Sequence, residues 1–109
     1  MAYDDKLAER ARDVLALRQG VSERKMFGGI AFMLDGNMAC GVLDDDLIVR
    51  VGPDEYERAL AERHAREFDF TGRPSKGIVV VSAEGVASDE ALTEWVEAGA
   101  DFAGSLPPK

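Results

Sequence analysis

The dipeptide Asp35-Gly36, placed between two apolar runs, is the feature that most constrains how this chain folds. The runs are Ile30–Leu34 and Met38–Leu43. Asp-Gly readily adopts the positive backbone φ angles of a type I′ turn, and this turn joins paired antiparallel strands. We therefore expect a β-hairpin here.

Three further segments favour extended structure. Leu47–Val51 follows an Asp44–Asp46 turn and is rich in β-branched residues, which indicates a third strand of a meander. Ile78–Val81 is the most continuous strand pattern and is expected inside the sheet. Phe68–Phe70 is expected to be a short extended segment, followed by a turn at 72–74.

Three helices are expected around these strands. The spacing of apolar residues predicts an amphipathic helix over Tyr3–Leu17. Pro53 suits the first turn of a second helix, which is expected to end near His64. Ser88 is a suitable N-cap for a third helix that Pro107 ends.

The resulting order is α-β-β-β-α-(β)-β-α, in a single domain spanning residues 1–109. Turns between the first strands are too short for parallel crossovers, so the fold class is α+β, with a mainly antiparallel sheet and helices packed on it. Ser22–Lys25 is expected to be a polar linker. Ala31 and Met33 share the sheet face opposite Ile30 and Phe32, so neither face is polar, and a homodimer is an open alternative.

The composition favours a soluble domain without a cofactor. A hydrophobic content of 46% in 109 residues is enough for a core. Cys40 is the only cysteine, which excludes a disulfide framework and a CxxC metal site. No apolar run is as long as a membrane span, and the first residues lack a signal-peptide pattern. We expect a cytoplasmic protein that does not bind membranes.

The charge balance disfavours nucleic acid as the default partner. Thirteen Lys and Arg residues and 21 Asp and Glu residues give a net charge of −8, which repels a phosphate backbone at long range. A local cationic patch can still bind, so direct DNA binding stays open as an alternative.

The residues that could carry chemistry favour structural roles, and we predict no enzyme. Gly28-Gly29 precedes a strand and not a helix, which favours a turn or a close backbone approach over a phosphate site. His64 is expected to cap a helix end. Asp44–Asp46 lacks the spacing of a calcium loop. Cys40 is expected to be buried, and no serine has the setting of a catalytic nucleophile. We expect neither a catalytic residue nor a metal site.

Four cations beside glycines are the candidate recognition surface: Arg24, Lys25, Arg73 and Lys76. They fall in segments expected to be loops, and an acidic groove on a protein partner would suit them. Arg50 interrupts an apolar strand, which favours an ion pair or an exposed edge. A small-molecule pocket near Phe27, Cys40 and Arg73 is a weaker alternative.

Several short motifs together resemble the N-terminal domain of the TfoX/Sxy competence-regulator family. The resemblance covers nearly the whole chain and depends on the order and spacing of the motifs. They are Lys25–Gly29, Asp35–Met38, Asp46-Leu47, Arg50–Gly52, Asp69–Pro74 and Ser105–Pro108.

This resemblance implies a non-enzymatic regulatory module. Full-length family members act as coactivators of competence genes together with the cyclic-AMP receptor protein, so a protein partner in the transcription machinery is expected. Because this sequence ends at Lys109, we expect a stand-alone copy of the first domain, without the C-terminal domain of those members. The family offers no catalytic or ligand residues to carry over.

Overall fold

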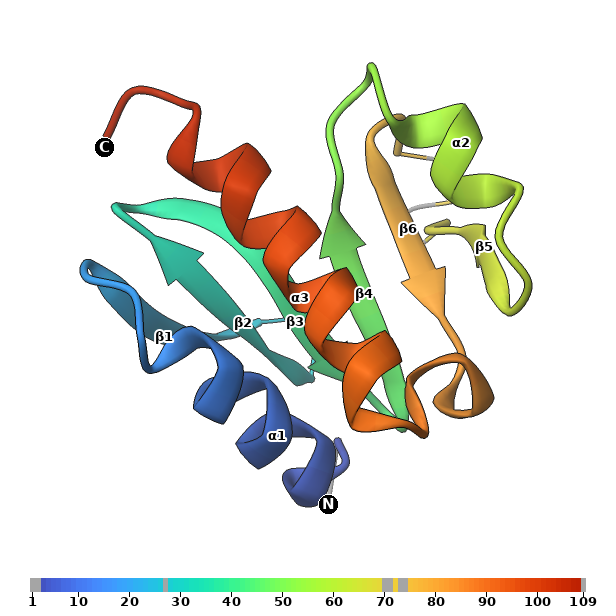
Figure 1. The fold of residues 1–109 in the computed structure, drawn as a ribbon, viewed down its shortest axis with the longest axis horizontal. Helices are drawn as coiled ribbons and strands as arrows, with labels where there is room; N and C mark the ends of the chain where they lie inside the picture. The colour runs from blue at the N-terminus through green and yellow to red at the C-terminus, as the bar shows by residue number, and fades with distance from the viewer. Residues whose placement is uncertain (1–2, 27, 70–71, 73–74, 109) are drawn as a thin grey trace.

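The computed structural model describes residues 3–26, 28–69, 72 and 75–108, and its described strands form one six-stranded antiparallel sheet (Figure 1). The strand order is β1-β2-β3-β4-β6-β5. The strands are β1 (Val21–Met26), β2 (Gly29–Leu34), β3 (Asn37–Leu43), β4 (Asp46–Arg50), β5 (Ala65–Glu67) and β6 (Ile78–Val81). The helices are α1 (Asp5–Leu15), α2 (Tyr56–Leu60) and α3 (Asp89–Gly104), with a 3-10 helix η1 (Ala83–Val86) before α3.

The predicted hairpin is confirmed as β2 and β3. Asp35 and Gly36 have φ angles of 51° and 86°, and Leu34 lies opposite Asn37 across the turn. Gly29 is the first residue of β2, and a Cβ atom added to it would lie 2.2 Å from the Val42 carbonyl oxygen. The close backbone approach expected at the glycine pair is therefore present.

The α+β class and the predicted order are confirmed, but the segment expected to be a polar linker is strand β1. Its residues pair with β2, from Val21 opposite Leu34 to Met26 opposite Gly29. β1 is an edge strand, and its residues 22–25 are exposed. A strand in this position needs no apolar alternation, so its sequence has no strand pattern.

Several element boundaries differ from the expectation. The first helix begins only at Asp5, because Asp4 is its N-cap and Tyr3 is bridged to Asp44. α2 is shorter than predicted at both ends, since Pro53 lies in the turn before it and Leu60 ends it.

Strand β5 also lies earlier than the predicted segment Phe68–Phe70, and Phe70 is outside the described residues. The turn expected at 72–74 includes Arg73 and Pro74, which are outside them as well. β6 is confirmed and lies inside the sheet, between β4 and β5. Ser88 caps α3 as predicted, since its Oγ accepts a hydrogen bond of 3.1 Å from the Ala91 amide.

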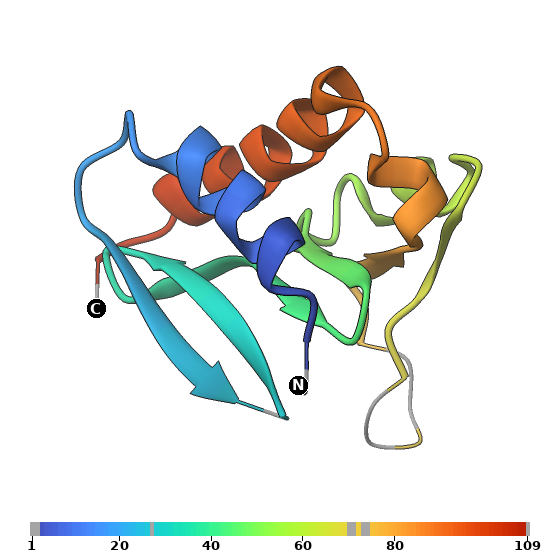
Figure 2. The same cartoon turned by 90° about the horizontal axis from the view of Figure 1, so that it is seen from below.

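The core lies between the sheet and the helices, which Figure 2 shows together on one side of the sheet. Phe32, Val49 and Val79 are fully buried there. α3 packs very close to β3, since a Cβ atom on Gly99 would lie 2.2 Å from the Ala39 carbonyl oxygen. A glycine at this position lets the helix approach the sheet backbone.

The opposite face of the sheet, called here the outer face, is also apolar. The pairing of the strands places Ala31, Ile48 and Val80 side by side across β2, β4 and β6. Their side chains point away from the core, because successive residues of a strand face opposite sides of the sheet and their neighbours in sequence face the core. All three are buried. Met33, Met38 and Ile78 are half-buried. The prediction that neither face is polar is confirmed.

Candidate functional site

Two of the predicted recognition cations lie on β1. Arg24 pairs with Ala31 and Lys25 with Ile30, so their side chains project to opposite faces of the sheet. Both are exposed. The expectation that they lie in a loop is wrong, because they belong to an edge strand.

The third cation, Lys76, lies far from this pair. Residue pairing from strand to strand connects Lys25 of β1 with Val81, the last residue of β6. Lys76 lies before the first residue of β6, Ile78, and therefore at the opposite end of that strand. β1 and β6 are also four strands apart in the sheet, which corresponds to about 19 Å. The structure does not bring Lys76 together with the β1 cations, and Arg73 lies outside the described residues.

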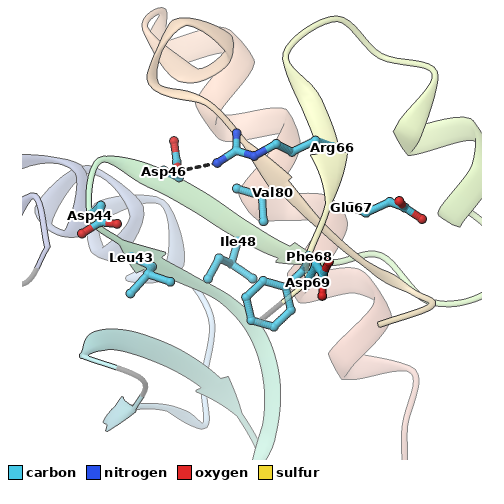
Figure 3. A pocket seen from close by; sticks show the side chains of 9 residues that line it. All are labelled: Leu43, Asp44, Asp46, Ile48, Arg66, Glu67, Phe68, Asp69 and Val80. Carbon is cyan, nitrogen blue, oxygen red and sulfur yellow. Dashed lines mark hydrogen bonds and ion pairs between the residues drawn. The ribbon is translucent and has the colours of Figure 1, made fainter. Parts of the chain in front are cut away.

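A cavity of about 270 Å³ lies on the outer face, between β4, β6 and the segment after β5 (Figure 3). Ile48 and Val80 line it from the sheet, and Phe68 projects beside Ile48. Arg66 and Asp46 form an ion pair of 2.7 Å at its rim. The remaining lining residues are Leu43, Asp44, Glu67 and Asp69.

The charge of this cavity is opposite to that of the predicted recognition surface. Asp44, Glu67 and Asp69 are exposed at its rim, and Arg66, its one lining cation, is already paired. A ligand that enters it meets negative charge above an apolar floor. It is therefore unsuited to phosphate or carboxylate ligands.

A second cavity of about 270 Å³ lies at the end of the sheet where β4 ends and β6 begins. Arg50 and Lys76 line it together with Phe102 of α3. The Arg50 guanidinium carbon lies 5.3 Å from the Phe102 ring centroid, a cation–π contact. The other lining residues are Met38, Gly52, Pro53, Gly77 and Ile78.

The prediction for Arg50 is wrong on both counts. β4 lies inside the sheet, between β3 and β6, so Arg50 is not at an exposed edge. Its contact is aromatic, and no carboxylate within the described ranges forms an ion pair with it. Arg50 is half-buried at the last position of β4.

The remaining candidates have structural roles. Cys40 is fully buried, and this burial raises the pKa of its thiol to about 12. Cys40 is in the core and therefore cannot line the alternative pocket expected near Phe27, Cys40 and Arg73. Phe27 and Arg73 are outside the described residues. Asp44–Asp46 is the β3–β4 hairpin turn, as expected.

His64 does not cap α2. The helix has Ala61 as its C-cap, and His64 follows with a φ angle of 74° and accepts a hydrogen bond from the Ser82 amide at its carbonyl oxygen. The predicted capping role is wrong because the helix ends earlier. Within the described ranges, no group of three or more His, Cys, Asp or Glu residues is arranged to hold a metal ion.

The antiparallel sheet and the helices on one of its faces define a small α+β domain. Its sequence also assigns it to a family. The chain belongs to the TfoX N-terminal domain family, whose model matches residues 13–103. This family is in general non-catalytic.

Comparison with curated proteins and with solved structures gave no match. In the described part of the chain, no helix has the length and apolar character needed to cross a membrane.

Proposed function

We propose that this chain is a non-enzymatic regulatory domain that binds a protein partner in the cytoplasm. Membership of the TfoX N-terminal domain family supports this proposal, since the resemblance to competence coactivators implies a partner in the transcription machinery. The lone, buried Cys40 suits a reducing compartment.

The edge strand β1 is the observation that carries the proposal. β1 is six residues long and pairs only with β2 among the described strands, so its outer edge is open for another strand. An extended segment of a partner can add to such an edge through main-chain hydrogen bonds. This mode of binding needs no pocket.

The charges on β1 indicate an acidic partner segment. Arg24 and Lys25 are exposed and project to the two faces beside the open edge. Glu23, the neighbouring acid, is already engaged, because its carboxylate accepts hydrogen bonds of 2.5 and 2.9 Å from Arg12 of α1. The local surface is therefore positive although the whole chain has a charge of −8.

Affinity purification from the host, with nuclease treatment, identifies the partner and separates protein contacts from DNA bridges. The double variant Arg24→Glu/Lys25→Glu should then weaken binding of the purified partner more than about tenfold, because each cation becomes a repelling charge. Lys76→Glu is the matched control, since Lys76 is also exposed but lies at the opposite corner of the sheet. Equal losses in both variants, or no loss in the double variant, would refute β1 as the binding edge.

Direct DNA binding is the competing function. It predicts a complex whose affinity falls steeply with salt, because cations on the protein release the counterions of the backbone. A mobility-shift titration at low salt tests it directly. A complex lost in the Arg24→Glu/Lys25→Glu variant would assign the β1 cations to DNA.

A homodimer through the outer face is compatible with either function. The half-buried residues Met33, Met38 and Ile78 leave apolar surface on the face without helices. Sedimentation velocity of the purified domain measures this association, and a monomer at high concentration would exclude it.

A further inference from the structure

The cavity lined by Arg50 and Lys76 has no assigned role and differs in charge from the surfaces around it. It lies where β3 and β6 begin and β4 ends, and Phe102 of α3 lines it together with the strands. Both of its charged lining residues are cations, although the chain as a whole has a net charge of −8. A cavity with this lining attracts an anion.

Arg50 differs from the other half-buried arginines in having no carboxylate partner. Arg10 pairs with Asp89, Arg12 with Glu23, and Arg18 with Glu97 and Asp101. Within the described ranges, Arg50 forms neither an ion pair nor a side-chain hydrogen bond with a carboxylate. Its five N–H donors are therefore available to a ligand.

The surroundings of Arg50 hold its guanidinium in place without neutralising it. The ring of Phe102 lies 5.3 Å from the guanidinium carbon, and Gly52 lets this ring approach the strand end, where a Cβ atom would lie 2.4 Å from the ring. A planar guanidinium that is already oriented loses little freedom when it binds an oxyanion through two parallel hydrogen bonds. Arg50 is thus suited to a carboxylate or phosphate group.

Lys76 supplies the second charge, and the rest of the lining supplies apolar contact. Lys76 is exposed at the mouth of the cavity, next to Gly77, whose carbonyl accepts hydrogen bonds from the Val51 and Gly52 amides and so fixes the local backbone. Met38, Ile78 and Phe102 form the apolar lining. A ligand with an oxyanion and a small apolar body would contact both parts.

The adjoining cavity limits the size and charge of this ligand. It shares Gly52 and Phe102 with the Arg50 cavity and is lined by Asp54, Glu55 and Asp101. Glu55 pairs with Arg58 and Asp101 pairs with Arg18, whereas Asp54 forms no ion pair among the described residues. The charge of Asp54 therefore opposes a chain of phosphates that runs past Arg50. A single compact anion satisfies the two cations, whereas a polyanion such as DNA meets this negative charge beyond them.

We propose that this cavity binds a small organic anion, with its carboxylate or phosphate group held by Arg50 and Lys76 and its apolar body against Phe102, Met38 and Ile78. This site is separate from the β1 edge and does not depend on the protein-binding function. The two possible head groups share the same recognition chemistry, and the choice of probe distinguishes them.

Amide chemical shifts of the purified domain measure the binding of three probes: phenyl phosphate, benzoate and inorganic phosphate. We expect saturable shifts at Gly52 and Gly77 with at least one aromatic probe, at a dissociation constant of about 1 mM or below. The preferred aromatic probe identifies the head group. Inorganic phosphate should bind more weakly, because it makes no apolar contact.

Two variants test the cations. Arg50→Gln should weaken the preferred probe at least about tenfold, since it removes a charge-assisted hydrogen-bonding group. Lys76→Gln should weaken it by a smaller factor and cannot disturb the fold, because its side chain is exposed. Arg63→Gln is the matched control, an exposed cation outside the lining of this cavity, and should leave binding unchanged.

The proposal is overturned if none of the probes gives saturable shifts, or if a folded Arg50→Gln variant and the Lys76→Gln variant both bind as the original chain does. Inorganic phosphate that binds as tightly as both aromatic probes would also overturn it, since the apolar wall would then be unused. The Arg24→Glu/Lys25→Glu variant should bind the probe normally. Failure at the cavity and failure at the β1 edge are therefore distinguishable.

Discussion

Replacing Gly99 with alanine should destabilise the domain, although alanine is the better helix former. Gly99 lies in α3 against the backbone of β3, and an added Cβ atom would lie 2.2 Å from the Ala39 oxygen and 3.0 Å from its carbonyl carbon. Backbone atoms of a central strand cannot rotate away from this contact. Either the helix must move outward or the strand must bend.

The magnitude follows from two opposing terms. Glycine to alanine within a helix stabilises by about 1 kcal/mol. Overpacking a core costs about 1–3 kcal/mol, and a contact this short with backbone places Gly99→Ala at the upper end of that range. The expected net loss is about 2 kcal/mol in the free energy of unfolding, which lowers the melting temperature by roughly 9 °C in a domain of this size.

Urea unfolding followed by far-ultraviolet circular dichroism measures this loss, provided that the slope with denaturant is unchanged. Gly104→Ala is the matched control in the same helix, because its Cβ atom would meet only Leu34 Cδ2, at an ordinary contact distance of 3.4 Å. That variant should equal or exceed the original stability by up to about 1 kcal/mol. A Gly99→Ala variant as stable as the original chain would refute the close approach of α3 to β3.

Two further predictions concern ionisable side chains. Because burial raises the pKa of the Cys40 thiol to about 12, a thiol reagent at pH 8 should react only when the domain opens, and a fast reaction in the native state would contradict its burial. The side-chain hydrogen bond with Arg12 lowers the pKa of Glu23, so this pair stabilises the fold above about pH 4.5 and loses its effect as the pH falls through the lowered value. In the Arg12→Gln variant, the free energy of unfolding should therefore fall less on acidification than in the original chain. Arg58→Gln removes an exposed ion pair within one helix turn and should leave this pH dependence unchanged.

The parts of the fold that depend on local chemistry were predictable from the sequence. Asp35-Gly36 fixes the hairpin because only certain residues accept the two φ angles. Ser88 signals the start of α3 because a hydroxyl can accept from an amide two or three residues ahead. Both signals involve neighbouring residues, so no tertiary contact was needed to interpret them.

The parts that depend on pairing across the sheet were not predictable. β1 has a charged sequence with no strand pattern, and only its partner β2 makes it a strand. Likewise, Arg50 and Lys76 line one cavity because Arg50 pairs with Ile78 across β4 and β6. The sequence did contain a signal for this cavity, since Arg50 interrupts an apolar strand, but it could not say whether the charge was paired.

A charged residue in a strand has a different meaning at an edge and inside a sheet. On β1 the charges of Arg24 and Lys25 remain in water and leave the backbone edge available, so they can bias which partner segment pairs there. β4 pairs with a strand on each side, so its backbone edges are not available to a partner. A cation is tolerated there because Arg50 is the last residue of the strand, and its guanidinium lies beside Phe102 and the cavity at the end of the sheet. The position of each cation in the strand order therefore separates the two proposed sites: the cations of the edge strand belong to the proposed recognition of a macromolecule, and Arg50 belongs to the proposed binding of a small anion.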